Sequence, residues 1–138
     1  MPAVLRRLAA LALLPLLAAC ENSATAFMVE GNQHAVILVR EQPYFWTSEV
    51  NQAVVVSRLP ACQRKVNIHS SPTDLVEMEV YEAGDLLWAL RQGQRWYLAS
   101  TDKCLVQDWV NEAGSPPGAL VGTFRLRDGA PAFERAGG

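Results

Sequence analysis

Two short segments carry side chains that could do acid–base or nucleophilic chemistry. Residues 69–74 contain a histidine, two serines and an aspartate, the residue types of a catalytic triad. They fall within one predicted turn, however, where these side chains cannot converge as acid, base and nucleophile. Glu77 and Glu79 lie on one face of a predicted strand, about 7 Å apart, a spacing that could suit hydrolysis if a cleft were present. Since the sequence indicates no such cleft, it predicts no catalytic residues, and we expect a protein that is not an enzyme.

The N-terminal segment has the three-part organisation of a secretory signal peptide. Arg6 and Arg7 precede about ten apolar residues, and small residues follow them. The segment ends in Leu17-Ala18-Ala19-Cys20, which resembles the cleavage box of bacterial lipoprotein precursors. The resemblance implies that residues 1–19 are removed and that Cys20 becomes a diacylated first residue. The alternatives are ordinary signal peptidase cleavage and an uncleaved transmembrane helix, but the apolar run is shorter than the roughly 20 residues that a span requires.

The same resemblance implies where the protein is held. The residue after the lipidated cysteine helps to sort lipoproteins of bacteria with two membranes, and an aspartate there favours the inner membrane. The residue here is Glu21, so we expect the periplasmic face of the outer membrane in preference to the inner membrane. The covalent lipid on Cys20 would be the membrane anchor, and no other cofactor is expected.

Composition limits the partners of the remaining chain. Removing residues 1–19 leaves one domain's length of chain, with ten basic and fourteen acidic side chains and a net charge of −4. This charge gives no electrostatic footprint for nucleic acid and no polybasic patch for an anionic bilayer. We therefore expect no nucleic-acid partner, attachment to the membrane through the lipid, and at most an envelope protein as a further partner.

The two remaining cysteines are expected to form a disulfide. If lipid consumes the thiol of Cys20, Cys62 and Cys104 are left as a pair in an oxidising compartment. Their spacing is far from the Cys-x-x-Cys of redox proteins, and zinc would need further cysteine or histidine ligands at short spacing. The sequence therefore predicts a structural Cys62–Cys104 bridge and no metal site.

Alternating apolar residues and frequent turns predict a mainly β domain. We expect a tether over residues 20–33, a single domain over residues 34–134 and a frayed tail over residues 135–138. The predicted fold is a small antiparallel β-sandwich or partly closed barrel of about seven to nine strands, after an N-terminal signal helix. A hairpin at Gly93 is expected to place Trp96 on the face of Trp88. The predicted strands are 34–40, 53–59, 62–69, 76–80, 86–91, 94–99, 103–110, 120–126 and 130–134.

Tyr44, Phe45 and Trp46 are the candidate contact surface. They form the densest aromatic cluster in the chain, and aromatic residues are enriched at interface hot spots. Core packing is the competing interpretation. Consecutive strand residues point to opposite faces, so at least one ring should face away from the core.

These features favour a membrane-anchored binding or envelope accessory module that is not an enzyme. Two alternatives remain open: a small envelope hydrolase, and a small-ligand carrier with a cavity inside the β-shell. Converging Glu, His or Ser side chains in a pocket would favour the hydrolase, and a deep apolar cavity would favour the carrier. A flat or aromatic patch would favour the binding module.

Overall fold

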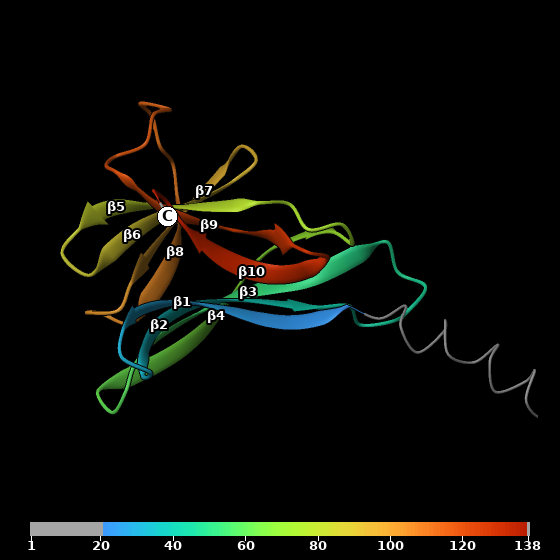
Figure 1. The fold of residues 1–138 in the computed structure, drawn as a ribbon. Coiled ribbons are helices and arrows are strands. Elements are labelled where there is room, and N and C mark those ends of the chain that lie inside the picture. The colour runs from blue at the N-terminus through green and yellow to red at the C-terminus, as the bar shows by residue number, and fades with distance from the viewer. Residues whose placement is uncertain (1–20, 138) are drawn as a thin grey trace, which may run out of the picture.

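The computed structural model describes residues 21–137, which form ten antiparallel strands in two sheets (Figure 1). No helix occurs in this range, so none there is long and apolar enough to cross a membrane. The predicted signal peptide, its helix and Cys20 lie outside the described residues. The strands are β1 (Asn22–Glu30), β2 (His34–Glu41), β3 (Glu49–Arg58), β4 (Cys62–Pro72), β5 (Met78–Gly84), β6 (Leu87–Gln92), β7 (Arg95–Ser100), β8 (Leu105–Trp109), β9 (Leu120–Arg127) and β10 (Ala130–Arg135).

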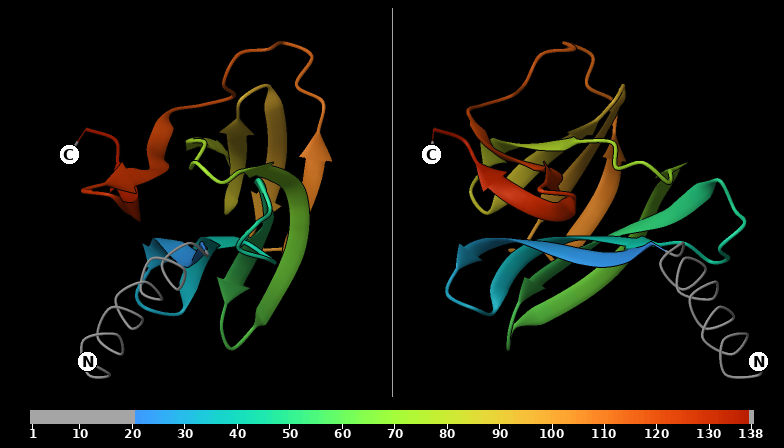
Figure 2. Two further views of the ribbon diagram at one scale, coloured as in Figure 1. Left: turned by 90° about the vertical axis from the view of Figure 1, so that its right-hand side faces the viewer. Right: turned by 45° about the vertical axis from the view of Figure 1, so that its right-hand side comes forward.

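The two sheets pack face to face as a β-sandwich (Figure 2). The first sheet is a simple meander in the order β1-β2-β3-β4, and the second has the order β10-β9-β5-β6-β7-β8. Strands β5 to β8 also form a meander. The chain then crosses to the free edge of β5, where β9 pairs with β5 and β10 pairs with β9. The predicted small antiparallel β fold is therefore confirmed, and its two sheets do not join into a closed barrel.

Alternating side chains from both sheets fill the space between them. Val36 and Leu38 of β2 point inward, as do Val54 and Val56 of β3. Since side chains alternate along a strand, each of these strands turns every second residue toward the core. The second sheet closes the core with large buried side chains: Met78, Val80, Trp88, Leu90, Tyr97, Val106 and Phe124.

The predicted tether over residues 20–33 is wrong, because residues 22–30 form strand β1. Their small and polar composition suggested a linker, but Phe27 is buried, edge-on against the ring of Trp88 at a centroid distance of 5.7 Å. The strand also hydrogen-bonds along the whole of β2. Strand β1 raises the count from the predicted seven to nine strands to ten. Residues 22–30 consequently belong to the domain, which was expected to begin at residue 34.

The predicted frayed tail is also too long. Arg135 belongs to β10 and donates a hydrogen bond from Nη2 to the carbonyl oxygen of Met28 at 2.6 Å. The amide of Ala136 donates to the carbonyl oxygen of Val121 at 2.9 Å. Strand β10 thereby reaches across to β1 and brings the edges of the two sheets together on this side.

The predicted disulfide is confirmed. Cys62 opens β4 with its side chain half-buried on the same face as Val66 and Ile68, and Cys104 lies in the turn before β8. The two Cα atoms are 6.3 Å apart, within the usual range for a bridge. Because β4 and β8 are edge strands of different sheets, the bond joins the sheets on the side opposite β1 and β10.

The predicted face of Trp96 is wrong. Gly93, with a φ of 60°, and Gln94 make a two-residue turn, which sets Gln92 opposite Arg95. The register then pairs Leu90 with Tyr97, so that Tyr97 shares the core face and Trp96 lies on the outer face of the sheet.

Candidate functional site at the N-terminal end of the domain

The interior of the sandwich becomes polar at one end. The inward positions that hold Val36 and Leu38 of β2 continue as Arg40 and, just after the strand, as Gln42, and both of these polar side chains are buried. Other strands contribute further buried polar residues at this end. They are Gln52 of β3, Ser71 of β4 and Gln92 of β6.

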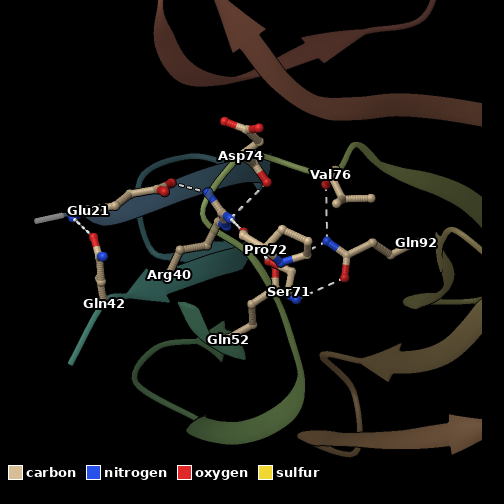
Figure 3. Close-up of polar contacts among 9 residues, drawn as sticks. All are labelled: Glu21, Arg40, Gln42, Gln52, Ser71, Pro72, Asp74, Val76 and Gln92. Atoms are coloured by element: carbon tan, nitrogen blue, oxygen red, sulfur yellow. Dashed lines mark hydrogen bonds and ion pairs between the residues drawn. The ribbon is translucent and has the colours of Figure 1, made fainter. Parts of the chain in front are cut away.

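Arg40 is the centre of this polar end. Its side chain is only 1% exposed, and its guanidinium pairs with the carboxylate of Glu21 (Figure 3). The Nη2 atom also donates to Ser71 Oγ at 3.0 Å and to the carbonyl oxygen of Pro72 at 2.8 Å. Burial lowers the pKa of Arg40, and the nearby Glu21 carboxylate opposes that shift. Glu21 is therefore the group that compensates a charge taken out of water.

Gln42 joins the first described residue to the loop between β2 and β3. The side-chain Oε1 of Gln42 accepts a hydrogen bond from the backbone N–H of Glu21 at 2.9 Å. The backbone N–H of Gln42 donates to the carbonyl oxygen of Glu21 at 2.7 Å. The Nε2 atom of the same side chain donates to the carbonyl oxygen of Thr47 at 2.9 Å. Glu21 is consequently fixed through its backbone as well as its side chain, and the loop is fixed to it.

A pair of glutamine side chains connects the two sheets within the same polar end. Nε2 of Gln52 donates to Oε1 of Gln92 at 2.8 Å, and Nε2 of Gln92 donates to Oε1 of Gln52 at 3.1 Å. Gln52 also donates to the carbonyl oxygen of His69, and Gln92 to that of Val76. Because buried amides are costly without partners, these reciprocal bonds stabilise the contact between the sheets.

The predicted aromatic cluster lies at the tip of the loop between β2 and β3. We call residues 43–48 the aromatic loop. Tyr44, Phe45 and Trp46 are 55%, 52% and 68% exposed. The backbone forms a turn here and not a strand, so the opposite-facing rule does not apply and all three rings are exposed. The competing interpretation of core packing is therefore wrong.

The three rings pack mainly against one another. The rings of Tyr44 and Trp46 stack at a centroid distance of 4.7 Å, and Phe45 meets Trp46 edge-on at 4.9 Å. Thr47 closes the turn, with its hydroxyl donating to the carbonyl oxygen of Tyr44 at 2.8 Å. The loop thus presents a compact apolar tip to solvent.

The aromatic loop and the start of the described chain lie at the same end of the sandwich. Figures 1 and 2 show the loop between β2 and β3 beside the point where β1 begins. The hydrogen bonds of Gln42 to Glu21 and to Thr47 place both segments there. Glu21, the first described residue, is therefore at the same end as the aromatic loop.

The residues with possible catalytic chemistry do not come together. The predicted turn at residues 70–74 starts later, because β4 continues to Pro72. The side chain of His69 is exposed, whereas Ser71 is buried against Arg40. Glu77 pairs with Arg125, and Glu79 accepts a hydrogen bond from the Tyr81 hydroxyl. Within residues 21–137, no group of three His, Cys, Asp or Glu side chains is arranged to hold a metal ion.

A shallow hollow of about 460 Å³ lies on the outer face of the second sheet. Trp96 and Trp109 meet edge-on there at a centroid distance of 5.6 Å, and the Arg91 guanidinium lies over the Trp96 ring. The lining of the hollow also includes Asp108 and Arg95 but no histidine, serine or glutamate. The lining of this hollow is therefore mainly aromatic and charged.

Comparison of the chain with models of known families, with characterised proteins and with solved structures finds no significant match. The function must therefore be inferred from the chain's own residues. The sequence-based prediction missed Arg40 and Glu21 as a pair. The available signal was the spacing of Arg40, which stands in step with Val36 and Leu38 on the inward face of β2.

Proposed function

We propose that this chain is a lipid-anchored envelope protein that acts as a non-enzymatic binding or accessory module. Cys20 would carry the lipid, and the β-domain would face the periplasm from the outer membrane. The observation that carries the proposal is the Leu17-Ala18-Ala19-Cys20 box after an apolar segment. Two or more acyl chains make anchoring stable where one would not.

The start of the domain supports this proposal. Glu21 bonds to Arg40 through its side chain and to Gln42 through its backbone. A lipid on Cys20 would therefore be attached directly to a folded body. Such a protein acts at the bilayer surface, on components that lie within the height of one small domain.

The arrangement of the interior favours a binding module over the two alternatives. Large side chains such as Trp88, Tyr97 and Phe124 fill the space between the sheets, so the core has the packing of a solid sandwich. A carrier would need that volume for its ligand. A hydrolase would need a base near a nucleophile that a substrate can reach. His69 and Ser71 do not meet. His34 Nε2 lies 2.7 Å from the Thr101 hydroxyl, but Thr101 is fully buried.

Acyl labelling in a bacterium with two membranes tests the anchor. The wild-type chain should incorporate a clickable palmitate analogue and fractionate with the outer membrane, and Cys20→Ala should do neither. Cys62→Ala, which removes a cysteine of the disulfide, is the matched control and should keep the label. Normal labelling and membrane retention of Cys20→Ala would refute the proposal.

Chemical cross-linking in intact cells tests the binding role. After detergent extraction, the wild-type chain should be recovered in a defined cross-linked complex with an envelope component. Cys20→Ala, released from the membrane, should lose that complex. A lipidated chain that forms no defined complex would argue against a binding module while leaving the anchor intact.

A further inference from the structure

We propose that the aromatic loop is a second membrane contact, which inserts Tyr44, Phe45 and Trp46 into the interface of a zwitterionic bilayer beside the lipid on Cys20. The inference rests on the proposed lipid anchor and names the partner of the candidate contact surface. It also assigns an orientation to the domain, with the polar end of the sandwich against the membrane.

The first argument is position. Cys20 directly precedes Glu21 in the sequence, and consecutive Cα atoms are about 3.8 Å apart, so a lipid on Cys20 would be attached beside Glu21. Glu21 is fixed by Arg40 and Gln42, and the same Gln42 side chain holds the loop through Thr47. A lipid anchor at Cys20 must then bring this end of the domain, and the loop with it, to the bilayer surface.

The second argument is the chemistry of the loop tip. Tryptophan and tyrosine are enriched where membranes meet water, because their rings are apolar and their N–H or O–H groups still find polar partners. Here all three rings are more than half exposed. The adjacent residues Pro43, Thr47 and Ser48 carry no charge, so the whole tip can enter the interface without burying an ion.

The third argument is charge. Acidic residues flank the loop, with Glu41 before it and Glu49 after it, and both are exposed. Lys65 pairs with Glu41 at 3.7 Å and so does not offer an unpaired cation to a phosphate headgroup. Binding should therefore come from the rings and not from anionic lipid, and it should be insensitive to salt.

Quenching of Trp46 by brominated lipid tests the inference. The lipidated full chain is purified in detergent, its acylation is established by intact mass, and it is reconstituted into phosphatidylcholine vesicles brominated near the headgroup. Trp88 and Trp96 are buried in the domain and Trp109 is half-buried on the far sheet, so Trp46 is the exposed reporter. The matched variants are Trp46→Phe, which removes the reporter, and Trp109→Phe, which removes another tryptophan.

We expect brominated vesicles to quench the wild type and Trp109→Phe alike and to spare Trp46→Phe. Raising the salt concentration from 0.05 to about 0.5 M should not change the quenching. Equal quenching of wild type and Trp46→Phe in a lipidated sample would overturn the inference and leave the anchor standing. If the mass shows no lipid on Cys20, the proposed function fails, and the same assay on the unlipidated chain mixed with vesicles decides the loop contact independently.

Photo-cross-linking distinguishes the bilayer from a protein partner. A diazirine amino acid at Phe45 in native membranes should give phospholipid adducts after irradiation. A defined protein adduct in place of lipid would overturn the inference. Replacing Tyr44, Phe45 and Trp46 together with serine should lower the partitioning of the unlipidated chain into phosphatidylcholine vesicles by about tenfold or more. Unchanged partitioning would count against it.

Discussion

The carboxylate of Glu21 pairs with the guanidinium of Arg40, which is buried at the end of the sandwich core. The residue directly after the proposed lipidated cysteine is therefore part of the folded structure. The pairing also explains why β2 can end its inward face with a charged side chain, since the charge is compensated within the domain.

Breaking this pair from the glutamate side should destabilise the fold. Glu21→Gln keeps the shape but removes the main carboxylate that compensates the Arg40 charge, leaving only the weaker effect of Asp74. It should lower the free energy of unfolding by about 2–3 kcal/mol, less than for a fully buried pair because Glu21 is partly exposed. Urea denaturation at pH 7 measures this. Glu30→Gln, on an exposed acidic residue at the end of β1, is the control and should change stability by less than about 0.5 kcal/mol.

Removing the charge itself should cost less. In Arg40→Met an apolar side chain replaces the guanidinium, and the desolvation cost disappears with the pair. We expect the double variant Glu21→Gln/Arg40→Met to be more stable than Glu21→Gln alone. If the change in the free energy of unfolding of the double variant equalled the sum of the changes in the two single variants, this would contradict the coupling between Glu21 and Arg40.

The aromatic loop should contribute little to stability. Tyr44→Ala, Phe45→Ala and Trp46→Ala each remove an exposed ring, so each should change the free energy of unfolding by less than about 1 kcal/mol. Phe27→Ala, in the core, is the comparison and should cost about 3–5 kcal/mol. Thermal denaturation of the four variants checks this. If any of the three loop variants lost as much stability as Phe27→Ala, its ring would be shown to support the fold.

The strands that the sequence predicted are those with a clear pattern of apolar residues and with recognisable turn residues at their ends. Residues 34–40 and the meander from β5 to β7 were found because apolar positions and the Gly93 turn are explicit in the sequence. The Cys62–Cys104 bridge followed from the number of cysteines and is present. These features are local, or depend on counting, and need no knowledge of the tertiary fold.

The features that the sequence did not predict depend on contacts between distant segments. Strand β1 is small and polar, and only the pairing with β2 and the contact of Phe27 with Trp88 make it a strand. The outer position of Trp96 depends on the exact turn length, since one residue reverses every face. For the aromatic loop, the sequence predicted at least one exposed ring. It could not predict that all three are exposed, because aromatic residues suit a core as well as a surface.

The disulfide should stabilise the domain substantially. Cys62 and Cys104 are separated by 42 positions, and in the chain-entropy model a loop of this length gives about 4 kcal/mol. Cys62→Ser/Cys104→Ser should therefore denature at lower urea concentration, with a somewhat larger m-value because the unfolded chain without the cross-link exposes more surface. Mass mapping of the exported protein without reductant should find the linked peptides. Two thiols that alkylate readily without reductant would contradict the bridge.

Alkaline pH should destabilise the protein in part through Tyr97. Burial raises the pKa of the Tyr97 hydroxyl, while the hydrogen bond from the His69 amide opposes the shift. The folded state thus keeps the proton that the unfolded chain loses near pH 10, so stability is present below that pH and falls as pH rises toward the raised pKa. Tyr97→Phe should lose about 1 kcal/mol at pH 7 and show a shallower fall above pH 10. If the fall of stability with pH were as steep in Tyr97→Phe as in the wild type, this role would be contradicted. A smaller fall that remains in the variant is expected, because the pKa of Tyr81 is also raised.

The direct attachment of the domain to Cys20 should matter for how the aromatic loop meets the bilayer. Inserting ten Gly and Ser residues between Cys20 and Glu21 leaves the Glu21–Arg40 pair and the Gln42 bonds in place. The free energy of unfolding should therefore stay within about 0.5 kcal/mol of the wild type. The insert adds a flexible span of about 17 Å, which lowers the local concentration of the loop at the interface, and quenching of Trp46 by brominated lipid should fall. A sequence-matched insert in the exposed turn at Gly31, at the opposite end of β1 from Glu21, is the control and should leave the quenching unchanged. Full quenching with the linker at residue 20 would mean that the loop holds the bilayer by its own affinity, and that the fixed position of Glu21 does not orient the domain.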